Sequence, residues 1–373
     1  MIYLDYAANT PVDDSVIDEF VRATKKYIAN PNSSHLLGKE ASIEIDECSS
    51  YLAHYFKCDS KGIIYTSGSS ESNNLVIKGI ASKYIGENKN IIISSLEHSS
   101  IVAPCNYLTS LGFDVNVISV GKDGKIDLEE LKNTINKDTI LVSICSVDSE
   151  LGTIQPIDEI ASIVKEYPDC VFHTDATQAI GKTYVDFSNV DFITFAPHKF
   201  FGLNGFGALV NRNNIKLLPL IHGGKSTTIY RSGTPVTANV VALKKAFMLA
   251  VEDLDKREKY IKELNDLLRE SLSKYDFIHI NSPKNSIYNT LNISLIGINN
   301  LDVVEELEKK DIYVSTTTAC SLGNMPSKSV LAITNDEKLA SNTIRISMSH
   351  LTTKEDINNF LKEFISVLEK LKK

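Results

Sequence analysis

No segment of the sequence is apolar over enough residues to cross a membrane, because none approaches the roughly 18 consecutive apolar residues that a spanning helix needs. The first residues, Met1 to Asp5, also lack the basic and then apolar order of a secretion signal. Basic runs are missing too, and 39 Lys and Arg against 47 Asp and Glu give a net charge of −8. We therefore expect a cytoplasmic protein that binds a small molecule and has neither a membrane nor a nucleic acid as its partner.

Cysteine is scarce and unpaired along the chain. The six cysteines form no Cys-x-x-Cys motif, and a chain of 373 residues needs no disulfides to hold a core. Neither a disulfide framework nor a metal site is expected. The composition, with 43% hydrophobic and 23% charged residues, is that of a globular protein. Since the length is about two and a half times that of a typical domain, it favours two packed domains.

Between residues 61 and 212, short β-branched runs alternate with amphipathic stretches. Strands and helices that alternate in this way form right-handed β-α-β units and a mostly parallel sheet flanked by helices. Ligands of such sheets bind at the carboxyl ends of the strands. Earlier helices are expected over 14–29 and 39–56. The strand candidates are 62–68, 90–95, 115–120, 139–146, 170–177, 191–197 and 205–210.

The stretch from Val236 to Tyr275 contains neither Gly nor Pro and is rich in charge after Glu252, which predicts a long exposed helix that leaves the first domain. We expect an α/β protein with a large domain, residues 14–255, and a smaller α+β domain made of residues 1–13 and 256–373. The predicted elements of the smaller domain are strands over 277–282, 290–295, 312–320 and 343–349 and helices over 301–310 and 353–372.

A cluster of small polar residues, Thr66 to Ser72, lies between a predicted strand and a helix that begins near Asn73. Backbone N–H groups, hydroxyls and a helix N-terminus at such a turn suit a phosphate group. The cluster lacks the order of a P-loop, and residues 202–207 lack the order of a dinucleotide-binding motif. A plain capped turn is the alternative interpretation.

Two more polar residues end successive predicted strands. Asp175 follows a buried-looking strand, where a carboxylate needs a partner, and Lys199 follows the next strand, where a desolvated amine can form a Schiff base. Taken singly, an N-cap role for Asp175 and a solvated position for Lys199 are the simpler interpretations. Together with the phosphate-binding turn they meet three demands of pyridoxal phosphate: a phosphate anchor, a partner for the pyridine nitrogen and an amine for the aldehyde.

The motifs around these residues resemble the cysteine desulfurase branch of the class V aminotransferases, a family of fold-type I pyridoxal-phosphate enzymes. The segment from Asp175 to Gln178 and the pair His198-Lys199 carry the resemblance, and further motifs follow in the family's order over nearly the whole chain. These are 3–8, 30–35, 66–74, 97–98, 222–224, 231–234, 319–321 and 344–347.

The resemblance implies a role for each matching residue. Lys199 would hold the cofactor, Asp175 would keep its pyridine nitrogen protonated, and Gln178 would bond to its phenolic oxygen. His98 would stack on the ring and take part in proton transfer. The phosphate would be held by Ser69, Ser70, His198 and, from a neighbouring subunit, Thr234.

Thr234 would thus make a homodimer part of the active site. The resemblance also implies that Arg345 and Asn30 bind the substrate, with Arg345 gripping a carboxylate; an exposed charge at a strand end is the alternative for Arg345. Cys320 follows a run of small polar residues rather than a core pattern, and the resemblance makes it the nucleophile that accepts sulfur. An inert core thiol is the alternative for Cys320.

The chain departs from the family pattern at two places that concern the cofactor. Ser149 stands where the family has an Asn that contacts the cofactor oxygen and the substrate carboxylate, so we expect Ser149 to bind the cofactor with a shorter reach. Ala196 and Pro197 replace a Ser-Gly pair, which removes one hydroxyl and one backbone N–H from the phosphate site.

The resemblance implies one activity. A homodimeric enzyme would take sulfur from L-cysteine with the help of pyridoxal phosphate, hold it as a persulfide on Cys320 and release alanine. An iron–sulfur scaffold or a tRNA-thiolation protein would accept the sulfur. A selenocysteine lyase, another carbon–sulfur lyase and a non-catalytic homologue that serves as a binding partner are the alternatives.

Overall fold

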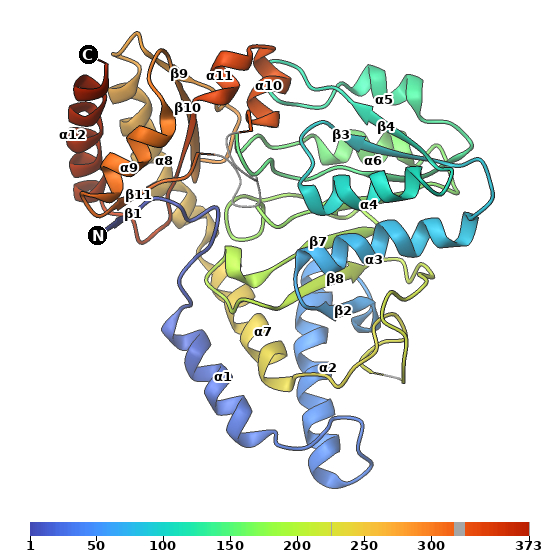
Figure 1. Ribbon diagram of the computed structural model, residues 1–373. Helices are drawn as coiled ribbons and strands as arrows, with labels where there is room; N and C mark the ends of the chain where they lie inside the picture. The colour runs from blue at the N-terminus through green and yellow to red at the C-terminus, as the bar shows by residue number, and fades with distance from the viewer. Residues whose placement is uncertain (225, 317–324, 373) are drawn as a thin grey trace.

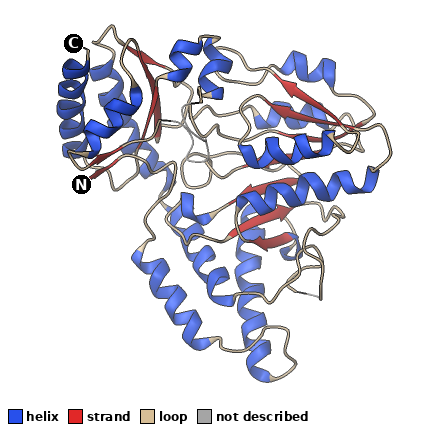
Figure 2. Cartoon of the chain, viewed as in Figure 1, coloured by secondary structure: helices blue, strands red, loops and turns tan. Residues whose placement is uncertain are grey.

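A computed structural model describes residues 1–224, 226–316 and 325–372 of the chain. Its described residues form two units, each with its own sheet and core (Figures 1 and 2). None of the described helices combines the length and the apolar character that a membrane span requires.

The larger unit is built on a seven-stranded sheet with the order β2-β8-β7-β6-β5-β3-β4. Strand β8 runs antiparallel to both of its neighbours, and all other pairs are parallel. The predicted mostly parallel sheet is therefore confirmed. Its strands are β2 (Ile63–Thr66), β3 (Asn90–Ser94), β4 (Asp114–Ile118), β5 (Thr139–Ser143), β6 (Val171–Asp175), β7 (Phe192–Phe195) and β8 (Gly207–Asn211).

Helices cover both faces of this sheet because successive strand residues point to opposite sides. Ile92 of β3 packs into a core that includes residues of α1, α2, α6 and α7, whereas its neighbours Ile91 and Ile93 pack into a core with α3 and α4. The helices of this unit are α1 (Asp14–Lys26), α2 (Leu36–Phe56), α3 (Ser69–Ala81), α4 (Ser99–Thr109), α5 (Leu128–Thr134), α6 (Ile157–Val164) and α7 (Thr237–Glu252).

The smaller unit contains an antiparallel sheet of order β12-β10-β9 and a parallel pair formed by β1 and β11. Both chain ends lie in this unit (Figure 1). Its strands are β1 (Ile2–Tyr3), β9 (Ile278–Ile280), β10 (Thr290–Leu295), β11 (Ile312–Tyr313) and β12 (Thr343–Ser347). Its helices are α8 (Leu254–Leu272), α9 (Asn300–Glu308), α10 (Lys328–Thr334), α11 (Glu337–Ser341) and α12 (Lys354–Leu371).

Two predictions about the smaller unit were wrong in detail. The long helix predicted after Val236 is divided at Asp253 into α7 and α8. The division has a tertiary cause, because the buried side chains of α7 belong to the core of the large sheet and those of α8 to the core of the smaller unit. Of the strand predicted over 312–320, the described part forms β11 and an isolated bridge at Ser315, and residues 317–320 lie outside the described residues.

Candidate active site

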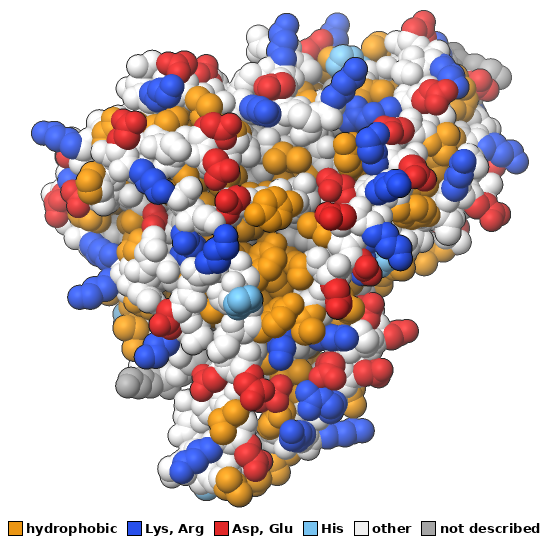
Figure 3. All heavy atoms as spheres, turned by 180° about the vertical axis from the view of Figure 1, so that it is seen from behind, with side chains coloured by type: hydrophobic (Ala, Val, Ile, Leu, Met, Phe, Trp, Pro, Cys, Tyr) orange, Lys and Arg blue, Asp and Glu red, His pale blue; other side chains and the backbone are white. Residues whose placement is uncertain are grey.

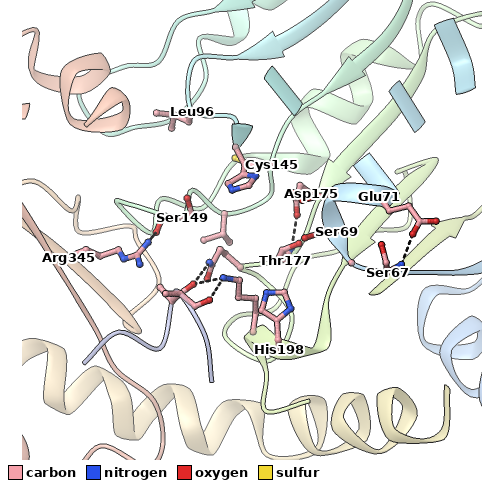
Figure 4. A pocket seen from close by; sticks show the side chains of 18 residues that line it. Ser67, Ser69, Glu71, Leu96, Cys145, Ser149, Asp175, Thr177, His198 and Arg345 are labelled. Atoms are coloured by element: carbon pink, nitrogen blue, oxygen red, sulfur yellow. Dashed lines mark hydrogen bonds between the residues drawn. The ribbon is translucent and has the colours of Figure 1, made fainter. Parts of the chain in front are cut away.

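A cavity of about 300 Å³ opens where β3, β5, β6 and β7 end. This is the edge at which ligands of parallel α/β sheets bind. Figure 4 shows Arg345 and Ser149 at one end of the cavity and the turn with Ser67, Ser69 and Glu71 at the other. The structure brings together most of the predicted site residues around it, namely Ser69, Ser70, His98, Ser149, Asp175, Gln178, His198, Lys199 and Arg345.

The turn before α3 has the form of an anion cradle. Gly68 is the N-cap of α3 and provides no side-chain cap, so the first turn of the helix is left for another acceptor, and the hydroxyl-bearing residues Ser69 and Ser70 line the cavity. A Cβ on Gly207 of β8 would lie 2.6 Å from the Cα of Gly68, so only glycine allows the strand to pass this turn. The donors present fit a phosphate group.

An acid beside this cradle is held in an ion pair. The Glu71 carboxylate accepts from the Ser67 backbone N–H at 2.7 Å and pairs with Arg231 Nε at 3.0 Å. Burial raises the pKa of Glu71, but the hydrogen bonds from Arg231 and Ser67 outweigh it, and the pKa lies below its ordinary value. Arg231 therefore compensates a negative charge next to a site for an anion, a role that the sequence did not reveal.

Asp175 ends β6 with both carboxylate oxygens engaged. Oδ2 accepts from Asn73 Nδ2 at 2.8 Å, and Oδ1 accepts from the Thr177 backbone N–H at 3.0 Å. The Asn73 amide also donates to Ser100 Oγ, which lies 2.8 Å from His98 Nδ1. Asp175 and His98, two predicted cofactor residues from different strands, are thus joined by a continuous hydrogen-bond network.

His98 is a neutral imidazole of defined tautomer. It is the N-cap of α4, and its Nδ1 accepts from the Ser100 backbone N–H at 3.1 Å, which leaves the ring proton on Nε2. Burial lowers the pKa of His98, and the cation of Lys199 acts in the same direction against the opposing effect of Asp175. Burial, with the cations of Lys199 and Lys182, likewise lowers the pKa of His198 to about 4.

The Lys199 amine lies against the N-terminal segment. Its Nζ donates to the backbone oxygens of Ala7 at 2.9 Å and Ala8 at 2.5 Å. Gln178 Nε2 donates to the same Ala7 oxygen at 3.0 Å. The amine, the Asp175 carboxylate and the cradle for an anion line one cavity, so the residues present fit pyridoxal phosphate.

Arg345 of β12 is 1% exposed and has one buried donor without an acceptor. Its Nη2 donates to Asp5 Oδ1 at 2.9 Å and its Nη1 donates to the backbone oxygen of Ser149 at 3.2 Å, whereas its Nε has no partner among the described residues. An unsatisfied buried donor is costly. Arg345 nevertheless lines the cavity, so part of its guanidinium group borders the space in which a ligand would bind.

Two predicted site residues do not line this cavity, and a third lies outside the described residues. Thr234 is exposed and lines a neighbouring hollow with Ser67 and Arg231. Asn30 is also exposed, and its side chain accepts from the Asn32 backbone N–H at 2.9 Å. Cys320 lies outside the described residues. The roles of all three residues stay predictions.

Comparison with known proteins identifies the family. The class V aminotransferase family model matches residues 2–360. The curated cysteine desulfurase IscS of Dictyoglomus turgidum is 38% identical over 376 residues, which cover 100% of this chain and 95% of that protein. The mitochondrial cysteine desulfurase of Arabidopsis thaliana is 36% identical over 379 residues, covering 100% of this chain and 83% of that protein.

Solved structures give the same result. A NifS-like protein superposes with a TM-score of 0.93 at 33% identity and covers 99% of this chain and 100% of its own. A structure described as SspA in complex with cysteine superposes with a TM-score of 0.82 at 32% identity, covering 95% of this chain and 100% of that chain.

Proposed function

The chain belongs to the class V aminotransferase family, and we propose that the cavity between Arg345 and the turn before α3 is where it takes sulfur from L-cysteine. It is a pyridoxal-phosphate-dependent cysteine desulfurase. The observation that carries the assignment of the site is that Lys199, Asp175 and the uncapped N-terminus of α3 share one cavity with Arg345.

Different residues of this cavity would bind different parts of the cofactor. The first turn of α3, with Ser69 and Ser70, would bind the phosphate, and the Asp175 carboxylate would bond to the protonated pyridine nitrogen. Lys199 Nζ would hold the aldehyde carbon. Bound pyridoxal phosphate supplies an electron sink for the substrate Cα.

Other residues act on the substrate. Arg345 would bind its carboxylate through the guanidinium group and so orient the amino acid. The Lys199 amine would take the proton from Cα, and the neutral His98 ring, with its proton on Nε2, would assist proton transfer. The Cys320 thiolate would attack the substrate sulfur, so that one S–S bond forms and one C–S bond breaks. L-Cysteine and the Cys320 thiol then give L-alanine and a Cys320 persulfide, which balances without another oxidant.

One experiment tests this function against the alternatives. The absorbance spectrum of the purified protein is recorded before and after L-cysteine is added, and alanine, pyruvate and protein-bound sulfur are measured in the same sample. We expect a bound chromophore, alanine and a persulfide in equal amounts. Pyruvate with ammonia would indicate a carbon–sulfur lyase instead. Turnover of selenocysteine without cysteine would indicate a selenocysteine lyase, and a colourless, inactive protein would indicate a non-catalytic homologue.

The proposed enzyme is a homodimer in which Thr234 reaches the phosphate of the partner's site. Its exposure, away from the cavity of its own chain, supports this arrangement. Figure 3 shows hydrophobic side chains gathered in the middle of one face, as on surfaces that bind another protein. Light scattering tests the dimer. Mixing a Thr234→Ala variant with a Lys199→Ala variant tests the shared site, because their heterodimer contains one wholly intact site and one doubly altered site.

We also propose a sulfur acceptor and a location. The acceptor is an iron–sulfur scaffold or a tRNA-thiolation protein, and transfer of labelled sulfur to each purified candidate distinguishes them. The location is the cytoplasm. The five cysteines among the described residues are free thiols, which a reducing compartment favours, and cell fractionation tests the location.

A further inference from the structure

A second lysine is buried behind the cavity. Lys182 follows β6 in the turn after Gln178, and it is only 7% exposed. Its Nζ donates to Gln178 Oε1. It does not line the 300 Å³ cavity, and it borders instead a space of about 20 Å³ on the other side of Lys199. That space has the volume of about one water molecule, so Lys182 faces no room for a substrate.

The Lys182 amine is buried beside two other basic side chains. Burial lowers its pKa well below the ordinary value, and the cations of Lys199 and Arg345 lower it further. A buried ammonium ion needs a compensating charge, and the charges that act on Lys182 are positive. The hydrogen-bond partner of this buried amine is Gln178 Oε1, which accepts from its Nζ.

This contact defines which way the Gln178 amide points. Oε1 accepts from Lys182, and Nε2 donates to the Ala7 oxygen at 3.0 Å. If the amide were reversed, its oxygen would face the Ala7 oxygen, two acceptors without a proton between them. In the observed orientation Nε2 has a second proton. Because Gln178 lines the cavity, that proton is available to an acceptor bound there.

We propose that Lys182 is a positioning residue, whose amine fixes the Gln178 amide so that its N–H group meets the phenolic oxygen of the cofactor. The proposal rests on the proposed function, since it requires pyridoxal phosphate in this cavity. Lys182 also acts on Lys199 indirectly, because Gln178 and Lys199 share the Ala7 oxygen. The chain thus uses one lysine to bind the cofactor and a second to orient a cofactor ligand.

The test uses Lys182→Met, which keeps the length of the side chain and removes its donor. The dissociation constant of pyridoxal phosphate is measured by equilibrium dialysis, and the absorbance of the bound cofactor is followed as a function of pH. We expect the dissociation constant to rise about fivefold to tenfold, the factor that corresponds to one lost hydrogen bond. The pH midpoint of the absorbance change should shift as well. The control Lys83→Met, which removes an exposed lysine far from the cavity, should change neither quantity.

A double-mutant cycle separates positioning from a general structural role. If Lys182 acts through Gln178, Lys182→Met should have no further effect in a Gln178→Leu background. Effects that add in the double variant, or an unchanged dissociation constant in Lys182→Met, would overturn the proposal. Should Lys182→Met fail to fold, Lys182→Gln supplies an amide donor. Its dissociation constant should stay within about twofold of wild type, and a loss of tenfold or more would overturn the proposal.

The same measurements on the wild-type holoenzyme distinguish a failure of the proposed function from a failure of the role proposed for Lys182. A wild-type protein that binds no pyridoxal phosphate, or that releases no alanine from L-cysteine, would contradict the proposed function. A functional wild type whose cofactor is unaffected by Lys182→Met would contradict only the role of Lys182.

Discussion

Lys199 and Gln178 donate to the same acceptor, the backbone oxygen of Ala7, at 2.9 and 3.0 Å. Ala7 belongs to the N-terminal segment, which also supplies Asp5 to Arg345. The segment begins with β1 in the smaller unit and reaches the cavity of the larger one. Residues from both units are thereby held in one site through a strand of two residues and the turn that follows it.

Lys199→Ala should abolish both cofactor attachment and turnover. Among the described residues Lys199 is the lysine that lines the cavity, so the variant loses the amine for the aldehyde and the base for Cα together. Alanine release should fall by more than about a thousandfold. The absorbance of the bound cofactor measures its attachment, and alanine release measures turnover. The matched control is Lys83→Met, and an undiminished rate in Lys199→Ala would show that the site is assigned wrongly.

Asp175→Asn should retain the cofactor but lose activity. An amide keeps an acceptor for the Thr177 N–H bond, yet it cannot hold a proton on the pyridine nitrogen, and an unprotonated pyridine is a weak electron sink. Alanine release should fall by at least about a hundredfold, with cofactor content nearly unchanged. Cofactor content and rate are measured on the same preparation. A rate near that of the wild type would contradict the role of Asp175.

The fold and the centre of the site could be predicted from the sequence because both depend on local patterns. Alternating apolar runs locate the parallel strands, and the ends of those strands place Asp175 and Lys199 at one edge. The break at Asp253 could not be predicted, since the local sequence contains no Gly or Pro and the cause is the packing of α7 and α8 against different cores.

Contacts that a residue makes through its backbone, or through a second residue, could not be predicted from the sequence. The contact between the Ser149 backbone oxygen and Arg345 could not be predicted from the sequence, and the role of the Ser149 side chain at the cofactor stays a prediction. Ala196 and Pro197 were expected to remove two donors from the phosphate site, and neither of them is among the residues that line the cavity, so the effect on the phosphate stays a prediction. Lys182 is four positions after Gln178, and only its burial distinguishes it from a surface lysine.

Arg345→Lys should weaken substrate binding more than it slows the chemical step. A lysine keeps the positive charge but loses the planar set of donors of the guanidinium group. The KM for L-cysteine should rise about tenfold or more, with a smaller change in kcat. Asp5→Asn is the comparison, because it keeps an acceptor for Nη2 and leaves the arginine in place. Equal KM values for Arg345→Lys and wild type would exclude the role of Arg345.

Cys320→Ser should spare the cofactor spectrum and the binding of L-cysteine while eliminating the persulfide. A hydroxyl cannot replace a thiolate as the nucleophile for sulfur. Labelled sulfur from cysteine should remain absent from the protein. Cys145→Ser is the matched control, because Cys145 lines the cavity but burial raises the pKa of its thiol well above the ordinary value, which disfavours the thiolate. Label on Cys145 in the Cys320→Ser protein would contradict the assignment.

Glu97→Gln should make the stability of the protein less dependent on pH. Glu97 is buried behind the cavity, where its Oε1 accepts from Ser94 Oγ and the Cys145 backbone N–H while its Oε2 has no partner among the described residues. Burial, with the charges of Asp175 and Asp148, raises its pKa to about 8. Between the ordinary pKa of 4.5 and this value the folded state binds a proton that the unfolded state does not.

The wild type should therefore lose stability as pH rises through this interval, by an amount on the order of a few kcal/mol. Gln keeps the acceptor, carries no charge and removes this part of the pH dependence. Urea unfolding between about pH 5 and pH 9 measures it, with the exposed Glu87→Gln as the control. Because the pKa of Glu97 is raised in the folded state, Glu97→Gln should gain stability relative to the wild type at the alkaline end of this pH range. A Glu97→Gln protein that gains stability only below about pH 5 would mean that Glu97 is ionised in the native state.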